Sequence, residues 1–332
     1  MTSTSPIPAS SLSPEDFISA VRERVAQVVV GQEVVVERIL TALLTSGHLL
    51  LQGMPGLAKT LLVDTVAKSI HLEFSRVQFT IDLLPSDILG SEILDQRLGD
   101  FRVRKGPVFT NLLLADEINR AAPKVQSALL EAMQERRVTI GTETFELPKP
   151  FVVIATQNPV EHSGTFELPE AQLDRFLMCH RLNYPTFAEE EEVVRRNLGL
   201  GLKRGEQGVV ARTEFDLLER EPVGTPDDLV CAMEKVHGVH VSETFQKHVV
   251  ELIHRTRAHP KLELGCSPRG AIALTKASRA RAFLHGRAHV VPGDLFALAE
   301  DTLLHRMRLK YEAIAEGATT QGVLREILEG MA

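Results

Sequence analysis

Apolar and polar positions change their spacing along the chain near residue 185. Before this point, five short apolar runs alternate with longer stretches of helical period, such as 59–71 and 123–137. Runs that are apolar at nearly every position are typical of strands buried on both faces. The alternation predicts a parallel α/β sheet of five strands. The five runs are 48–52, 76–80, 111–115, 151–156 and 177–182.

After Pro185 the strand-like runs cease and helical spacing dominates. Residues 200–225 are polar and contain glycine, as expected of a linker or an insertion. The pattern therefore predicts two domains, an α/β domain over 13–184 and a smaller all-helical domain over 185–332. The helices expected in the second domain are 187–199, 226–236, 242–258, 268–286 and 292–309.

The first residues differ from both domains in composition. Residues 1–12 are rich in Ser, Thr and Pro, which predicts a disordered tail. Ser13 and Pro14 then suit the cap and first position of a helix, and two acidic residues follow them. We expect this helix to continue with amphipathic spacing to Gln27, and a second helix at 33–45.

Composition excludes several classes of protein. The chain has 332 residues and a formal net charge of -7, and this acidic excess argues against a dedicated nucleic-acid binder. Its three cysteines lie far apart without CxxC spacing, which disfavours disulfides and zinc and favours the reducing cytoplasm. No apolar run reaches the roughly 20 residues of a membrane span, and the N-terminus lacks the pattern of a secretory signal.

The strongest chemical signal lies between the run 48–52 and the helix 59–71. A glycine-containing loop between a strand and a helix surrounds phosphate with backbone N–H groups. Lys59 would neutralise the β- and γ-phosphates, and the Thr60 hydroxyl would bind Mg²⁺. Ala58 departs from the usual glycine, and its methyl group is unfavourable if the residue is left-handed. The loop consists of Gly53, Met54, Pro55, Gly56, Leu57, Ala58, Lys59 and Thr60.

Two adjacent carboxylates form the second signal. Asp116 and Glu117 directly follow the apolar run 111–115. Alone, such a pair is typical of a solvated strand end. In the same predicted sheet as a phosphate loop, Asp116 is expected to hold the Mg²⁺ and Glu117 to polarise the attacking water.

Together with three later motifs, these segments resemble the AAA+ ATPases, and specifically the MoxR family. The resemblance covers about residues 15–310, and its motifs occur in the family's order. It implies a P-loop core with a parallel five-stranded sheet, a smaller all-α lid domain, and ATP with Mg²⁺ as cofactors. The carrying segments are Gly53–Thr60, Asp116–Ala121, Ala155–Pro159, Leu168–Phe176 and Ser267–Gly270.

The resemblance also implies roles that the residues alone leave open. Asn158 is similar to a sensor residue that orients the attacking water, although by itself it indicates an Asn-Pro turn. Arg175 is similar to an arginine finger that acts in the neighbouring subunit's site; the alternative is a surface pair with Asp174. Arg269 matches the second sensor, acting in cis or in trans. Gly31-Gln32 matches the stretch that lines the adenine pocket.

Two insertions fit the wider clade. Residues 138–147 alternate around Gly141-Thr142 and predict a β-hairpin. Residues 84–106 are expected as a second insertion within the helix that follows the second strand. By resemblance, both project toward the centre of a ring and contact the client protein.

The expected function is therefore ATP-driven remodelling or maturation of partner complexes by a ring, expected to be a hexamer. By resemblance, the client is a protein with a von Willebrand factor A domain, and the work is metal or cofactor insertion. Three alternatives stay open: a magnesium-chelatase-like ATPase subunit, a DNA-translocating relative, and an ATP-gated scaffold with slow turnover. The net charge counts against the DNA-translocating relative.

Overall fold

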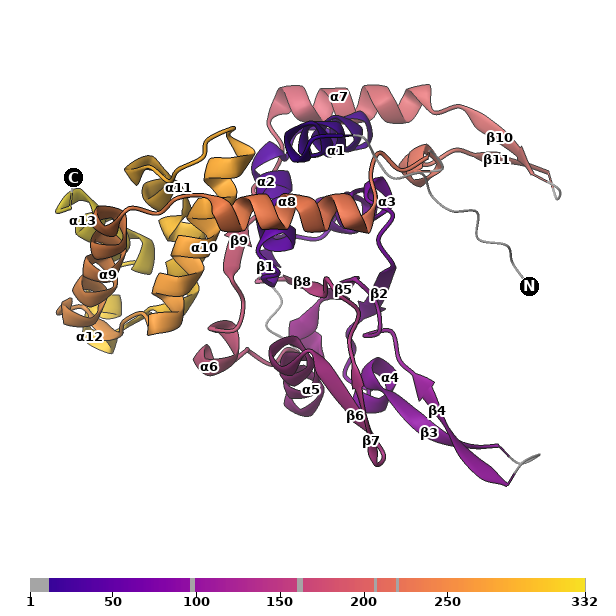
Figure 1. The fold of residues 1–332 in the computed structure, drawn as a ribbon, viewed down its shortest axis with the longest axis horizontal. Helices are drawn as coiled ribbons and strands as arrows, with labels where there is room; N and C mark the ends of the chain where they lie inside the picture. The colour runs from indigo at the N-terminus through magenta and orange to yellow at the C-terminus, as the bar shows by residue number, and fades with distance from the viewer. Residues whose placement is uncertain (1–11, 96–98, 160–163, 206–207, 219–220, 332) are drawn as a thin grey trace.

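The computed structural model describes residues 12–331 apart from 96–98, 160–163, 206–207 and 219–220. The predicted N-terminal tail, except Leu12, lies outside these residues. The central sheet has five parallel strands, as predicted, and their order is β2-β5-β8-β1-β9 (Figure 1). Each predicted run overlaps one strand. The strands are β1 (Leu49–Gln52), β2 (Phe74–Gln78), β5 (Leu112–Asp116), β8 (Val152–Gln157) and β9 (Met178–Arg181).

Alternate residues of the central strands enter two different cores. In β1, Leu49 and Leu51 join one apolar cluster, and Leu50 joins the other. The first cluster contains side chains of α1 (Pro14–Val28), α2 (Glu33–Leu44) and α3 (Lys59–Ser69). The second contains side chains of α4 (Pro85–Leu89) and α5 (Pro123–Glu135). Burial on both faces explains why the three inner strands, β5, β8 and β1, are apolar except near their carboxyl ends.

The start of α1 agrees with its sequence signals. The Ser13 hydroxyl accepts a hydrogen bond from the Asp16 N–H at 3.1 Å, and Pro14 occupies the first turn. These contacts satisfy N–H groups that the helix itself leaves unpaired. Both predicted N-terminal helices, α1 and α2, are confirmed.

The two predicted insertions are antiparallel hairpins. Residues 138–147 form β6 (Arg137–Ile140) and β7 (Glu143–Glu146) around Gly141, as expected. In 84–106, the helix that was expected to contain the insertion ends after the short α4. A hairpin of β3 (Gly90–Asp95) and β4 (Asp100–Lys105) follows it.

Glycine explains the early end of α4. Gly90 has a φ of 103°, and a Cβ there would lie 2.7 Å from the Gly106 nitrogen. Only a residue without a side chain allows the two ends of the hairpin to approach so closely.

The C-terminal part is mainly helical, with corrections to two predicted segments. The expected linker at 200–225 contains a hairpin, β10 (Leu202–Gly205) and β11 (Gly208–Ala211), and a 3₁₀ turn, η2 (Glu214–Leu218). The last predicted helix is too long: α11 is followed by the 3₁₀ turn η3 (Leu304–Arg306). The helices are α7 (Phe187–Gly199), α8 (Pro226–Gly238), α9 (Glu243–Ala258), α10 (Pro268–Leu284), α11 (Pro292–Leu303), α12 (Tyr311–Ala315) and α13 (Thr320–Glu329).

Tertiary pairing explains the shortened last helix. Strand β13 (Arg308–Leu309) pairs with β12 (Leu262–Leu264), so backbone groups that a longer helix would satisfy bond across two segments instead. Helix α8 contacts α1 and α2 as well as α10, and α7 lies along α1 (Figure 1). We propose the domain boundary near Pro185, because the last strand of the sheet ends at Arg181.

No helix in the described ranges is long and apolar enough to cross a membrane.

One buried histidine joins β1 to its surroundings. His48 is 7 % exposed; its Nε2–H donates to the Met133 carbonyl at 3.2 Å, and its Nδ1 accepts from the Val153 N–H at 3.0 Å. Burial lowers the pKa of His48 to about 4, against the opposing effect of the Met133 carbonyl. A proton added at Nδ1 would point at the Val153 N–H, and two donors would then face each other. The folded protein therefore requires the neutral ring.

We predict that His48 makes the protein less stable in mild acid. The unfolded chain binds a proton near pH 6.5 and the folded chain only near pH 4, so stability is complete above pH 6.5 and falls as the pH drops toward 4. Between pH 7 and pH 5 this contribution amounts to about 2 kcal/mol. His48→Gln should lower stability at pH 7 but reduce the pH dependence of urea unfolding by that amount. His71→Gln, at an exposed histidine, is the control. An unchanged pH dependence in His48→Gln would contradict the assignment.

Candidate active site

The glycine-containing loop lies between the carboxyl end of β1 and helix α3, as its sequence predicts. Gly56 has a φ of 86°, and a Cβ there would meet nothing within 4 Å. No side chain caps α3, and its first turn carries no acidic residue. The positive end of α3 is therefore open to an anion at the loop.

Lys59 is the first residue of α3 and reaches back over the loop. Its Nζ donates to the Gly53 carbonyl at 2.9 Å and to the Met54 carbonyl at 3.4 Å. Burial lowers the pKa of Lys59, and the nearby Asp116 and Glu117 carboxylates oppose this shift. The ammonium group thus lies between the loop and the two acidic residues.

Ala58 precedes α3 in a left-handed conformation, with φ 51° and ψ 24°. This is the conformation in which a methyl group is unfavourable. Such strain costs a residue other than glycine roughly 1–2 kcal/mol. The loop therefore keeps the shape that glycine usually provides, at a cost in stability.

A threonine hydroxyl fixes the two adjacent carboxylates. Thr156, in β8, donates to Asp116 Oδ1 at 2.6 Å and accepts from the Glu117 N–H at 2.8 Å. Glu117 has a φ of 57°, so the chain turns directly after β5. One buried side chain in the neighbouring strand therefore positions both acidic residues.

Strand β2 supplies further partners that the sequence did not reveal. Arg76 donates from Nη2 to Asp116 Oδ2 at 2.7 Å, and Gln78 donates from Nε2 to Glu117 Oε2 at 2.8 Å. Arg120 reaches the same Glu117 oxygen at 2.8 Å. Gln78 stands opposite Asp116 in the β2–β5 register, so only knowledge of the strand pairing could have indicated these contacts.

These residues fit a magnesium nucleotide. Thr60 follows Lys59 in the first turn of α3, and Asp116 ends β5 near Lys59, which provides hydroxyl and carboxylate oxygens suited to Mg²⁺. Asn158 follows β8 at the same edge of the sheet, and its carbonyl accepts from Asn119 Nδ2 at 3.4 Å. Ligands bind at this carboxyl edge in open parallel sheets.

The predicted adenine segment lies near this edge. Gly31 and Gln32 are both left-handed, with φ of 66° and 64°. A Cβ on Gly31 would lie 2.2 Å from Oε1 of Glu189 in α7, and a Cβ on Gly53 would lie 2.9 Å from Cβ of Leu182 just after β9. The start of α2, the loop and the chain after β9 therefore pack around a common region.

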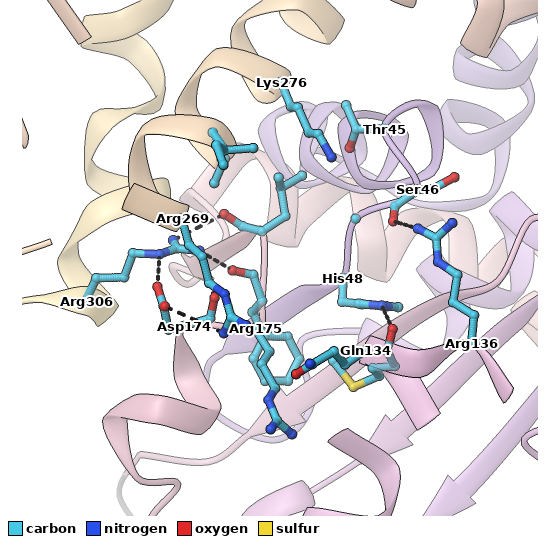
Figure 2. Close-up of a pocket in the computed structure, with 16 residues that line it drawn as sticks. Thr45, Ser46, His48, Gln134, Arg136, Asp174, Arg175, Arg269, Lys276 and Arg306 are labelled. Carbon is cyan, nitrogen blue, oxygen red and sulfur yellow. Dashed lines mark hydrogen bonds and ion pairs between the residues drawn. The ribbon is translucent and has the colours of Figure 1, made fainter. Parts of the chain in front are cut away.

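The two arginines predicted as site residues, Arg175 and Arg269, line a separate cavity of about 360 Å³. Arg175 follows α6 (Glu170–Leu173), and Arg269 lies in the first turn of α10 (Figure 2). Arg136 and Lys276 also line this cavity, and Asp174 is the only carboxylate among its lining residues. The strongly basic lining suits a polyanion.

This cavity lies at the opposite end of the sheet from the loop. Its lining includes His48, directly before β1, and Leu177, directly before β9. The phosphate loop instead follows the other end of β1. The predicted site residues therefore form two groups, one at each end of the strands.

Asp174 does not form the surface pair with Arg175 that was the alternative to a finger. It accepts from Nε of Arg306 at 2.8 Å and from the Ser267 hydroxyl at 3.0 Å. Arg175 Nε is buried and has no hydrogen-bond partner among the residues that the structure describes. Its guanidinium extends away from Asp174 in Figure 2.

Comparison with known proteins agrees with this geometry. Residues 48–178 match the model of the ATPase family associated with various cellular activities (AAA), and 254–327 match that of the AAA lid domain. Chaperone MoxR1 of Mycobacterium tuberculosis is 41 % identical over 93 % of this chain and 80 % of its own length. The chain belongs to the MoxR family of AAA+ ATPases. The expected family and fold class are thereby confirmed.

Two further likenesses extend over nearly the whole MoxR-family chain. YeaC of Bacillus subtilis is 45 % identical over 93 % of this chain and 92 % of its own. A crystal structure from Cytophaga hutchinsonii superposes with a TM-score of 0.85 at 43 % identity, covering 95 % of this chain and 94 % of that one. The family implies nucleotide binding, while the roles of individual residues stay predictions.

We predict that Ala58→Gly stabilises this MoxR-family protein. Relief of the left-handed strain, less the greater entropy of glycine in the unfolded chain, gives a net gain of about 0.5–1 kcal/mol. The measurement is the urea midpoint at unchanged m-value. The control is Ala297→Gly, at an exposed position inside α11, which should lose about 1 kcal/mol. Equal losses in both variants would show that Ala58 carries no strain.

Proposed function

We propose that this chain is the ATP-hydrolysing subunit of a ring that remodels or matures client protein complexes. The observation that carries the proposal is the division of the predicted catalytic groups between the two ends of one sheet. Lys59, Thr60, Asp116 and Glu117 lie at the carboxyl end, and Arg175 lies at the amino end. Neither end has a complete set for phosphoryl transfer.

A head-to-tail arrangement of subunits completes the set. The four residues of β1 separate the two ends by about 13 Å, at roughly 3.3 Å a residue. Because different surfaces of each subunit then meet, the contact repeats from subunit to subunit and forms a ring where the rotation closes. We take the ring to be a hexamer, as the family resemblance implies.

Groups at the carboxyl end would act on the subunit's own nucleotide. ATP with Mg²⁺ supplies the transferable phosphoryl group and the divalent charge. Lys59 would neutralise phosphate oxygens, and Thr60 and Asp116 would hold the Mg²⁺. The Glu117 carboxylate would accept a proton from the attacking water, which Asn158 would orient.

The partners of Glu117 and Asp116 bear differently on turnover. Gln78 and Arg120 occupy one Glu117 oxygen, and Arg76 occupies one Asp116 oxygen. Both Glu117 contacts are to Oε2, so Oε1 can accept the proton of the attacking water while they persist. Arg76 would yield its Asp116 oxygen where Mg²⁺ binds. These donors fix the directions of the two carboxylates.

Groups at the amino end would serve the neighbour's nucleotide. Arg175 would stabilise charge that develops on the transferred phosphoryl group. Arg269 lines the same basic cavity and lies 3.9 Å from Asp174, which assigns it to the same face. We therefore extend the proposal to a trans role for Arg269.

The two N-terminal hairpins form the proposed client surface. Lys105 of β4 lies 5.2 Å from the ring centroid of Phe145 in β7, and the turn at Gly141 packs against Glu92 of β3. The hairpins are therefore joined, and they extend together from the sheet (Figure 1). Phe101 in β4 is 64 % exposed and offers an apolar contact.

The client and the location rest on the family resemblance and on composition. A protein with a von Willebrand factor A domain remains the proposed client, and the cytoplasm the proposed compartment. The Glu117→Gln variant should retain client while ATP stays bound, and a second change, Phe101→Ser, should release it. Co-purification of a defined von Willebrand factor A domain protein with each variant measures this difference.

We predict that both proposed catalytic changes stop turnover without loss of nucleotide binding. Glu117→Gln removes the base, and Arg175→Ala removes the finger, which is worth about 10³–10⁵ in kcat. Steady-state ATPase assays should show at least a hundredfold loss for Arg175→Ala. Calorimetry should give an ATP affinity within a few fold of wild type for each variant.

A mixture of the two inactive variants tests whether the finger acts in trans. After random assembly, about one interface in four combines an intact Glu117 site with an intact neighbouring Arg175. The mixture should therefore recover about a quarter of wild-type activity. Retained turnover in either single variant, or no recovery on mixing, would reject the corresponding role. Slow turnover of the wild type itself would instead favour an ATP-gated scaffold.

A further inference from the structure

A buried arginine of the lid donates hydrogen bonds to the chain on both sides of Arg175. Arg306 ends the 3₁₀ turn η3, within the segment that matches the AAA lid, and its side chain is 3 % exposed. Its Nη2 donates to the carbonyls of Asp174 at 3.3 Å and Phe176 at 2.6 Å. Its Nη1 donates to the Leu177 carbonyl at 3.4 Å.

The same guanidinium holds the side chain that precedes Arg175. Arg306 Nε donates to Asp174 Oδ1 at 2.8 Å, and Nη1 also bonds the Thr302 carbonyl in α11. Asp174 further accepts from Ser267, the residue that caps α10, at 3.0 Å. The backbone around Arg175 is thus bonded to Arg306 of η3, and the Asp174 side chain is bonded both to Arg306 and to the start of α10. Figure 2 shows Arg306 beside Asp174.

We propose that Arg306 is a positioning residue for the arginine finger, coupling the lid of each subunit to the finger that this subunit presents to its neighbour. The inference rests on the proposed trans role of Arg175. A planar guanidinium offers several donors in fixed directions, so it can fix a backbone segment that a point charge could not. A lid movement in one subunit would then move Arg175 in the next subunit's site.

Arg308 provides a matched control. It lies two residues further along and also joins the lid to α6, through Glu170, and it pairs with Glu263 within the lid. Its side chain is 51 % exposed and its partners are side chains, so it does not hold the backbone beside Arg175. Loss of a lid-to-α6 ion pair alone is therefore tested by Arg308→Met.

The first measurement separates turnover from binding. Arg306→Met should lower kcat at least tenfold with a KM within twofold of wild type, because the finger is misplaced while the subunit's own site is intact. Arg306→Lys should lower kcat less, and Arg308→Met should stay within twofold in both constants. Thermal unfolding reports whether each variant is folded. If Arg306→Met is unfolded, the same comparison of kcat and KM is made on Arg306→Lys and Asp174→Asn, which should lower kcat and leave KM unchanged. A kcat within twofold of wild type in a folded Arg306→Met protein would overturn the proposal.

The second measurement identifies which site is affected. A finger-side defect in Arg306→Met should be complemented by Glu117→Gln, which has an intact finger, and should not be complemented by Arg175→Ala. Recovery with Arg175→Ala instead would show that Arg306 serves its own subunit's site, which overturns the proposal. Suppose that the mixture of Arg175→Ala with Glu117→Gln recovers ATPase activity and the mixture of Arg306→Met with Glu117→Gln does not. The positioning role of Arg306 is then rejected, while the trans role of Arg175 stands. If neither mixture recovers, the trans finger fails and the positioning role falls with it.

Discussion

Strand β1 is buried on both faces, so its only contact with solvent is through its two ends. This constraint places the phosphate loop at one end and the basic cavity at the other. In a parallel sheet covered by helices on both faces, the loops at the strand ends are the favoured places for a site. Each chain carries both groups of proposed catalytic residues, but at opposite ends of the sheet. The proposed ring follows from this, because only a contact between two chains brings the two groups together.

At the carboxyl end, side chains of neighbouring strands hold the acidic residues in place. Thr156 bonds both of them, and Arg76 and Gln78 add charge and amide donors from β2. Such preorganisation limits the reorganisation needed when charge develops in a transition state. Fixing the geometry of the site also has a cost. The left-handed conformation of Ala58 gives the phosphate loop its shape but lowers the stability of the fold.

At the amino end, the lid rather than the sheet positions the chemistry. Asp174 meets Arg306 and Ser267 from two lid elements, and the carbonyls around Arg175 bond the same guanidinium. In the proposed ring, a lid that moved over one nucleotide would in this way influence the next site. Coupling through such contacts requires an element with two positions that both sites influence, and the lid is the element placed to supply it.

The sequence by itself was enough to place the five strands, the phosphate loop, Asp116-Glu117 and the hairpin at 138–147, because these depend on local spacing and on a motif read along the chain. It was wrong about the end of α11, where pairing between distant segments overrides helical spacing. It placed the insertion at 84–106 within a helix, whereas the helix ends after α4 and a local hairpin follows. Only the tertiary structure decided that Arg175 and Arg269 share a cavity away from Lys59. Only it revealed Thr156, Arg76, Gln78 and Arg306 as partners. These contacts join residues from about 40 to more than 130 positions apart, and no periodic pattern records which strands pair or where a lid packs.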